Sequence, residues 1–195
     1  MESKTIDLKT RKLSSQFVNV GEFRFSESPV QFRTLLGSCV SVCLYDPFNQ
    51  FGGMNHILLP GRAEKEGGVL SARFGINAME LLINEFVKRG TPRSRLQAKI
   101  VGGGQTLNLG VQNSPIGDRN VEFVKDFLKS ESISLCGLET GGPYYRNLRF
   151  MTGTFEAFVK RVQVNLQKSF IERREVEYLR QIQADLGKKN RPIYF

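Results

Sequence analysis

Residues 36–45 read LGSCVSVCLY, and this stretch decides the prediction of the fold. From residue 39 onward, apolar and small polar side chains alternate, which is typical of a β-strand with two different faces. One face would carry Val40, Val42 and Leu44, and the other would carry Cys39, Ser41, Cys43 and Tyr45. We therefore predict a strand that begins at a cysteine.

The residues that follow predict a second strand and a hairpin. Residues 46–49 read DPFN, a composition typical of turns, and residues 51–59 are a largely apolar stretch that ends at a Pro-Gly pair. If Tyr45 faces Gln50 across the turn, the antiparallel register places Cys39 opposite His56, the only histidine in the chain. Directly opposed residues have Cβ atoms about 5 Å apart, so a thiol and an imidazole could interact there. A slip of one residue would move the imidazole to the opposite face.

A cysteine beside the only histidine suggests thiol catalysis. A neighbouring imidazole favours the thiolate of Cys39 and can protonate a departing amine. Gly37 would allow a tight bend that aims the backbone amide of Ser38 or Cys39 at a developing oxyanion. The structural alternative is a small buried apolar cysteine and a histidine that is simply a hydrogen-bonded polar residue. Spacing alone leaves both interpretations open.

Metal and nucleotide sites are less compatible with the sequence. Cys39 and Cys43 would lie about 13 Å apart on one strand, whereas two thiolates that share a zinc ion lie within about 4.6 Å of each other. The glycine pairs do not match a Walker motif, and a single histidine excludes an H-E-x-x-H site. We therefore expect no metal and no cofactor.

Two helices and several short strands are predicted after the hairpin. The first helix should begin near Ser71 and end at residues 88–90, with inward positions Ile76, Met79, Ile83, Phe86 and Val87. The second should run from near Asp118 for about three turns, with inward positions Val121, Val124 and Leu128. Strands are expected at 97–101, 133–138, 147–151 and 154–159. This mixture predicts a layered single domain of the α/β or α+β class.

The two ends of the chain differ from the middle. We predict an N-terminal extension at 1–17, a domain at 18–162 and a basic amphipathic helical tail at 163–195, whose apolar stripe is Ile171, Tyr178, Ile182 and Leu186. Residues 160–195 contain nine Lys or Arg against four Asp or Glu. An acidic partner, a nucleic acid, a membrane surface or simple solvation could each explain this charge. Aromatic residues are sparse there, so nucleic-acid binding is not expected.

Composition indicates a globular protein. Apolar residues make up 40% of the chain and charged residues 24%, which argues against intrinsic disorder. The charged N-terminus lacks the apolar run of a signal peptide, and no stretch approaches the roughly 18 apolar residues of a membrane span. The three cysteines are an odd number. We therefore expect reduced thiols, a cytoplasmic location and no membrane insertion.

Several motifs together resemble one family. They are LGSCVSVCLYDP at 36–47, GGMNHILLP at 52–60, AKIVGGG at 98–104, IGDRN at 116–120 and ETGG at 139–142. In this order they resemble the CheD family, the chemoreceptor glutamine deamidases of bacterial chemotaxis, over about residues 18–160. The resemblance implies a layered α/β domain with a β-sandwich-like core. It also implies a cysteine hydrolase that converts chemoreceptor glutamines to glutamates and releases ammonia.

The resemblance implies residue roles and partners as well. Cys39 would attack the carboxamide carbon, and His56 would protonate the leaving ammonia and then activate water. The family's third catalytic residue is a threonine shortly before the cysteine; Thr34 is the nearest threonine, and the spacing also points to Arg33. The expected partners are the cytoplasmic helices of methyl-accepting chemoreceptors. The alternative role is a regulatory binding module for a CheC-type phosphatase.

Overall fold

Two mixed β-sheets form the centre of the protein. The computed structural model describes residues 13–59, 67–106, 116–162 and 168–189. The four-stranded sheet contains, in spatial order, β1 (Ser15–Phe17), β3 (Gln31–Leu36), β8 (Tyr145–Met151) and β9 (Glu156–Val162). The five-stranded sheet contains, in spatial order, β2 (Phe23–Ser26), β5 (Phe51–Asn55), β4 (Val40–Asp46), β6 (Gln97–Gly102) and β7 (Ser134–Thr140).

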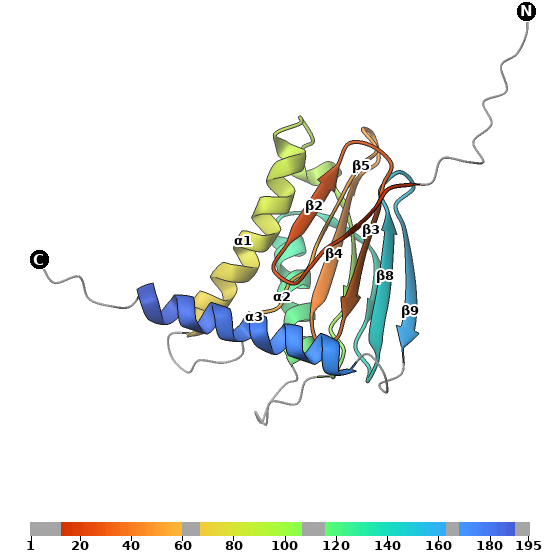
Figure 1. Ribbon diagram of the computed structural model, residues 1–195. Helices are drawn as coiled ribbons and strands as arrows, with labels where there is room; N and C mark the ends of the chain where they lie inside the picture. The colour runs from red at the N-terminus through yellow and green to blue at the C-terminus, as the bar shows by residue number, and fades with distance from the viewer. Residues whose placement is uncertain (1–12, 60–66, 107–115, 163–167, 190–195) are drawn as a thin grey trace, which may run out of the picture.

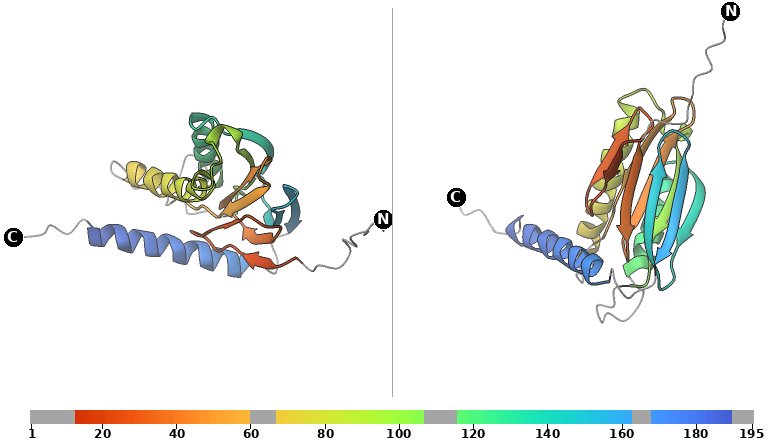
Figure 2. Two further views of the ribbon diagram at one scale, coloured as in Figure 1. Left: turned by 90° about the horizontal axis from the view of Figure 1, so that it is seen from above. Right: turned by 45° about the vertical axis from the view of Figure 1, so that its right-hand side comes forward.

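Three α-helices are described, and they occupy two different positions. The helices α1 (Gly67–Val87) and α2 (Ile116–Ser130) cover one face of the five-stranded sheet, while α3 (Lys168–Lys189) crosses one end of the strands (Figure 1). Figure 2 shows that α3 does not continue the helical layer. A 3-10 turn at Arg93–Arg95 leads into β6. The prediction of a layered α/β fold with a sandwich-like core and a C-terminal helix is confirmed.

The central strand β4 has an apolar layer on each side. Val40, Val42 and Leu44 pack against α1 and α2, as part of a core with Met79, Leu82, Ile83, Phe86, Val124 and Leu128. The opposite face, with Cys39, Cys43 and Tyr45, packs against the four-stranded sheet through Phe32, Leu36, Leu148 and Phe150. The predicted division of β4 into two faces is therefore confirmed, and both faces are buried.

The hairpin between β4 and β5 forms, but its predicted register is wrong. Tyr45 pairs with Gly52 rather than Gln50, and the four-residue loop spans 47–50. β5 ends at Asn55, and one further bridge joins Val40 to Ile57. In this register His56 is a diagonal neighbour of Cys39 instead of its direct partner, at about 7 Å. Because the shift is two residues and side chains alternate with a period of two, both side chains keep the same face.

The other predicted elements are found with small differences in their ends. α1 begins at Gly67 rather than near Ser71, and the chain leaves it through Gly90, which has a φ of 81°. Ile76 and Val87 were predicted to face inward, and this is wrong, because each is 43% exposed. The predicted inward residues of α2 are confirmed as buried.

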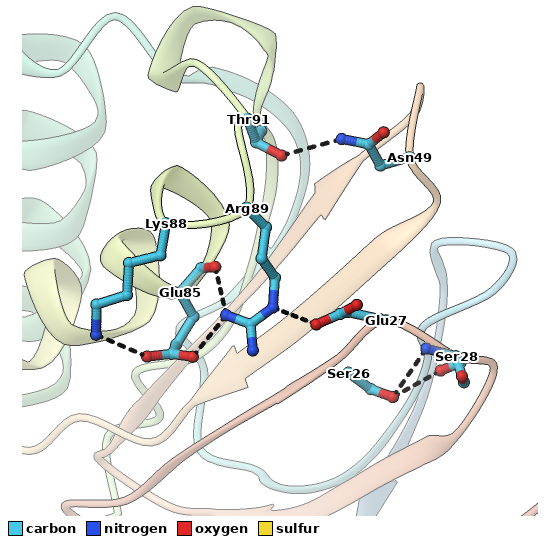
Figure 3. A network of polar contacts seen from close by, with 8 residues as sticks. All are labelled: Ser26, Glu27, Ser28, Asn49, Glu85, Lys88, Arg89 and Thr91. Atoms are coloured by element: carbon cyan, nitrogen blue, oxygen red, sulfur yellow. Dashed lines mark hydrogen bonds and ion pairs between the residues drawn. The ribbon is translucent and has the colours of Figure 1, made fainter.

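A polar network joins the end of α1 to the turn between β2 and β3. Arg89 donates hydrogen bonds to the backbone carbonyl and the carboxylate of Glu85, and it also pairs with Glu27 in that turn (Figure 3). Lys88 pairs with Glu85 at 3.3 Å. These contacts hold the edge strand β2 close to the helical layer.

The two ends of the described chain both contact the sandwich. β1, which lies within the predicted extension 1–17, pairs in parallel with β3. In α3, Ile182 is buried and Tyr178 partly buried, as the predicted stripe requires, while the side chains of Ile171 and Leu186 lie outside the described residues. Among the helices that the structure describes, none is long and apolar enough to cross a membrane.

Candidate active site

Residues 37–39, between β3 and β4, form a tightly held loop, which we call the cysteine loop. The carbonyl of Gly37 accepts a hydrogen bond from the amide of Gly104 at 2.8 Å, and the carbonyl of Cys39 accepts one from Gly103 at 2.7 Å. Between them, the carbonyl of Ser38 accepts from the side-chain amide of Asn120 at 2.8 Å. Hydrogen bonds to three successive carbonyls therefore fix the position of this loop.

The glycine motif after β6 explains why this loop can be held so closely. Gly102 has a φ of 121°, and a Cβ atom there would lie 2.2 Å from the carbonyl oxygen of Cys39. A side chain at this position is excluded by strain and by space. The motifs at 102–104 and 116–120 thus meet around Cys39, although they lie far from it in the sequence.

His56 is held by Thr34 from the opposite sheet. Thr34 lies on β3 with its side chain buried toward the five-stranded sheet, and its Oγ1 lies 2.9 Å from Nδ1 of His56. The hydroxyl of Thr34 donates its own proton to the carbonyl of Val18 at 2.7 Å. The site is therefore built across the two sheets, with Thr34 from one and Cys39 and His56 from the other.

These contacts define the tautomer of His56. The hydroxyl of Thr34 uses its single hydrogen in the bond to the carbonyl of Val18, so toward His56 its oxygen can only accept. Nδ1 of His56 therefore carries the proton. The carbonyl of Val18, 3.3 Å from Nδ1, can also only accept. Nε2 therefore has a free lone pair. This atom is buried and has no hydrogen-bond partner among the described residues.

A small pocket opens beside the imidazole, between α3 and the edge of the four-stranded sheet. It is lined by His56 together with Phe17, Asn19, Val20, Leu35, Arg174 and Glu175. Burial lowers the pKa of His56 to about 4, so the imidazole is neutral near pH 7. A neutral imidazole with a free Nε2 has the protonation state that a general base requires.

The buried thiol of Cys39 faces an acidic side chain that the sequence did not indicate. Glu175 of α3 accepts a hydrogen bond from the hydroxyl of Ser38 at 2.9 Å and another from the backbone amide of Cys39 at 3.3 Å. Burial raises the pKa of Cys39 well above its usual value, and the nearby Glu175 carboxylate raises it further. Burial also raises the pKa of Glu175. In this arrangement the thiol keeps its proton.

Comparison with known proteins identifies the family of the chain. A family model described as CheD chemotactic sensory transduction matches residues 58–161. A probable chemoreceptor glutamine deamidase CheD from Thiobacillus denitrificans is 36% identical over 168 residues, which cover 85% of this chain and 82% of the relative. The chain belongs to the CheD family. A second CheD relative, from Shewanella oneidensis, is 43% identical over 161 residues, covering 81% of this chain and 77% of the relative.

Similarity to solved structures is weaker than the similarity to CheD sequences. A hypothetical protein YfiH from Bacillus licheniformis superimposes with a TM-score of 0.42 at 16% identity, covering 62% of this chain and 51% of that chain. No inference about this CheD protein follows from a similarity at that level.

The structure brings most of the predicted CheD site residues into one place. Gly37, Ser38 and Cys39 surround the Glu175 carboxylate, and Thr34 contacts His56. No hydrogen bond joins His56 Nε2 to the thiol of Cys39 among the described residues. Arg33, the other position for the third residue, is exposed on β3.

The remaining cysteines have different surroundings. Cys43 is buried among apolar side chains, which raise the pKa of its thiol, and Cys136 is exposed. Within the described parts of the chain, no group of three or more His, Cys, Asp or Glu residues could hold a metal ion.

Proposed function

We propose that this CheD protein is a protein-glutamine deamidase whose nucleophile is Cys39 and whose general base is His56, positioned by Thr34. The observation that carries this proposal is the contact between His56 Nδ1 and Thr34, because it leaves Nε2 as a buried acceptor with no partner among the described residues. The strand register places His56 diagonally next to Cys39. The activity itself is the one named for the relatives from Thiobacillus denitrificans and Shewanella oneidensis.

The first step is acylation of the cysteine. His56 Nε2 takes the proton of the Cys39 thiol, and the sulfur attacks the carboxamide carbon of the substrate glutamine. The carboxamide oxygen becomes an oxyanion, and the backbone amide of Cys39 can donate a hydrogen bond to it. The same amide already donates a hydrogen bond to a carboxylate oxygen in this structure. The carbon–nitrogen bond then breaks, and His56 returns the proton to the leaving nitrogen as ammonia departs.

The second step is hydrolysis of the thioester. A water molecule gives a proton to His56 Nε2 and attacks the thioester carbon. The carbon–sulfur bond breaks, and His56 returns the proton to the sulfur of Cys39. The carboxylic acid that forms loses its proton to solvent, which leaves a glutamate side chain. Ser38 fits a positioning role, since its hydroxyl can accept a hydrogen bond from the carboxamide NH₂ and donate one to the product carboxylate.

The substrates that we propose are glutamines on the cytoplasmic helices of chemoreceptors, in line with the names of the relatives. A CheC-type phosphatase as a second partner stays a prediction, as do the cytoplasmic location and the boundaries at 17 and 162. Catalysis requires a neutral imidazole beside the cysteine loop, whereas a purely regulatory binding role does not. We therefore favour the enzyme over the binding module.

The proposal can be tested with a purified chemoreceptor cytoplasmic domain. After incubation with the wild-type protein, receptor peptides should show the mass gain that accompanies replacement of an amide NH₂ by OH, together with free ammonia. His56→Ala should abolish both signals. Complete absence of conversion by the wild type and by a variant of α3 that exposes the site would contradict the proposal.

A further inference from the structure

The carboxylate of Glu175 is bound by hydrogen-bond donors of the loop that ends at Cys39. One carboxylate oxygen is 3.3 Å from the backbone amide of Cys39, and the other is 2.9 Å from the hydroxyl of Ser38. The amide of Gly37 and the thiol of Cys39 also interact with this carboxylate. A glutamate side chain that projects from a helix into these donors has the chemistry of the proposed product.

The helix around Glu175 is seated on the protein by one face. Glu175 is 2% exposed, and Leu179 and Ile182, four and seven residues later, are 7% and 5% exposed. Tyr178 lies against Gly21, where a Cβ atom would come within 2.4 Å of its ring. On the flank, Arg174 donates a hydrogen bond to the side chain of Asn19 at 2.7 Å. Spacings of three, four and seven residues describe one continuous helical face.

The cysteine loop provides space for this carboxylate. A Cβ atom built on Gly37 would lie 3.0 Å from Glu175 Oε1 and 2.7 Å from the hydroxyl of Thr106. Any side chain at position 37 would therefore compete with the group that enters from α3. The missing side chain of Gly37 opens access to the amide of Cys39, which the proposed substrate needs as well.

We propose that α3 is bound in the substrate site as an internal analogue of the deamidated product, an inference that rests on the proposed function. A substrate segment then has the same pattern, namely a helix that presents a glutamine followed by apolar residues three, four and seven positions later. Such a helix must displace α3 to reach Cys39. The free protein is accordingly held in a product-bound form, in which the thiol is protonated and the backbone donors are occupied.

The proposal makes one chemical prediction that a structural helix would not. If Glu175 lies where the substrate side chain lies, Glu175→Gln places a carboxamide in the active site of the same molecule. Cys39 should attack it, ammonia should leave, and water should hydrolyse the thioester to restore glutamate at position 175. The encoded glutamine would then be found as glutamate in the purified protein.

The experiment is peptide mass mapping of full-length variants over time. Glu175→Gln should convert to glutamate at position 175, and the double variant with Cys39→Ala should keep its glutamine. Glu177→Gln is the matched control, because position 177 lies two residues away on the exposed side of the same helix. Its glutamine should persist in the presence of an intact Cys39.

Each outcome bears on a different claim. If the Glu175→Gln variant keeps its glutamine while the wild-type protein deamidates receptor glutamines, the α3 inference is overturned and the proposed function stays intact. If the variant keeps its glutamine and neither the wild type nor Glu175→Ala deamidates a receptor, the proposed function is overturned and the inference with it. Conversion that is equal with and without Cys39 would be spontaneous, and it would overturn the α3 inference alone.

Receptor deamidation rates give a second readout. Glu175→Ala removes the carboxylate that occupies the amide of Cys39, so the full-length variant should deamidate receptor glutamines at least about tenfold faster than wild type, as expected for loss of one charge-assisted hydrogen bond. Glu177→Ala should match wild type. A Glu175→Ala rate equal to or below wild type, in a variant that remains folded, would overturn the inference.

Discussion

The stability of the protein should fall on mild acidification because its one histidine is buried in neutral form. The pKa of His56 is about 4 in the folded protein, against about 6.5 for an unperturbed histidine. Between these values the unfolded chain binds a proton that the folded chain does not, so stability is complete above pH 6.5 and declines as the pH falls toward 4. From pH 7.5 to pH 5.5 the expected loss is about 1.4 kcal/mol of unfolding free energy.

The surroundings of His56 determine how this must be measured. Glu175 titrates in the opposite sense, because its raised pKa makes the folded protein bind more protons, and Arg174 and Glu22 act on the imidazole with opposite signs. Denaturant unfolding of wild type and His56→Gln at pH 7.5 and 5.5 separates these effects, since only the wild type contains the imidazole. The wild type should lose about 1.4 kcal/mol more than the variant.

A direct titration provides the independent check. The chain has one histidine, so NMR of the imidazole protons follows a single residue without assignment. The resonance should titrate near pH 4. A midpoint near 6.5, together with equal acid sensitivity of wild type and His56→Gln, would refute the account of a neutral buried base.

Three further predictions concern groups around the site and the sandwich. Thr34→Val should lower kcat on receptor glutamines about tenfold with little change in KM, because Thr34 positions His56 without touching the substrate. Thr34→Ser keeps the hydroxyl and should restore kcat. An equal loss of kcat in both variants would count against this role. Asp46→Asn should lower the unfolding free energy by about 2 kcal/mol at pH 7. Burial would raise the pKa of Asp46, but hydrogen bonds outweigh it and lower the pKa to about 2, so the deficit should shrink as the pH falls from about 4 toward 2. Asn120→Ala should cost about 2 kcal/mol or more in denaturant unfolding, since two backbone partners are left unpaired, while the exposed Glu122→Ala should cost almost nothing.

The alternation of residues 39–45 was sufficient to predict β4 and its two faces. A period of two is a local property, and β4 lies between two apolar layers that both require it. The register of the hairpin was not predictable in the same way, because a shift by two residues preserves every face. The choice depends on the position of the turn, and here the strand pair extends to Asp46 and Phe51.

The inward face of α1 was predicted only in part. Helical spacing includes Ile76 and Val87 in the apolar stripe, yet both are about half exposed, while Leu82 is fully buried. The apolar stripe of α1 is wider than the surface that contacts the sheet. Which apolar residues of the stripe are buried therefore depends on the strands that pack against the helix.

Glu175 was the residue of the site that sequence reasoning missed. In the sequence it is one of four acids in a basic segment, and charge counting treats it as part of a solvated face. The available signal was its position four residues before Leu179 and seven before Ile182, on the apolar stripe of the helix. An acidic residue within an apolar stripe is costly to bury unless it has a specific hydrogen-bonding partner. Here the partner is Cys39, which lies 136 positions away in the sequence.

The most direct test of the central claim compares two buried cysteines of β4 and its preceding loop. Cys39→Ala and Cys43→Ala each remove one thiol from the same face of the strand, and only Cys39 has a backbone amide in contact with a carboxylate. The measurement is the rate at which a receptor domain gains glutamate at its glutamine positions, by peptide mass mapping. The account predicts that Cys39→Ala abolishes conversion and that Cys43→Ala retains it. Conversion by Cys39→Ala at the wild-type rate would contradict the account.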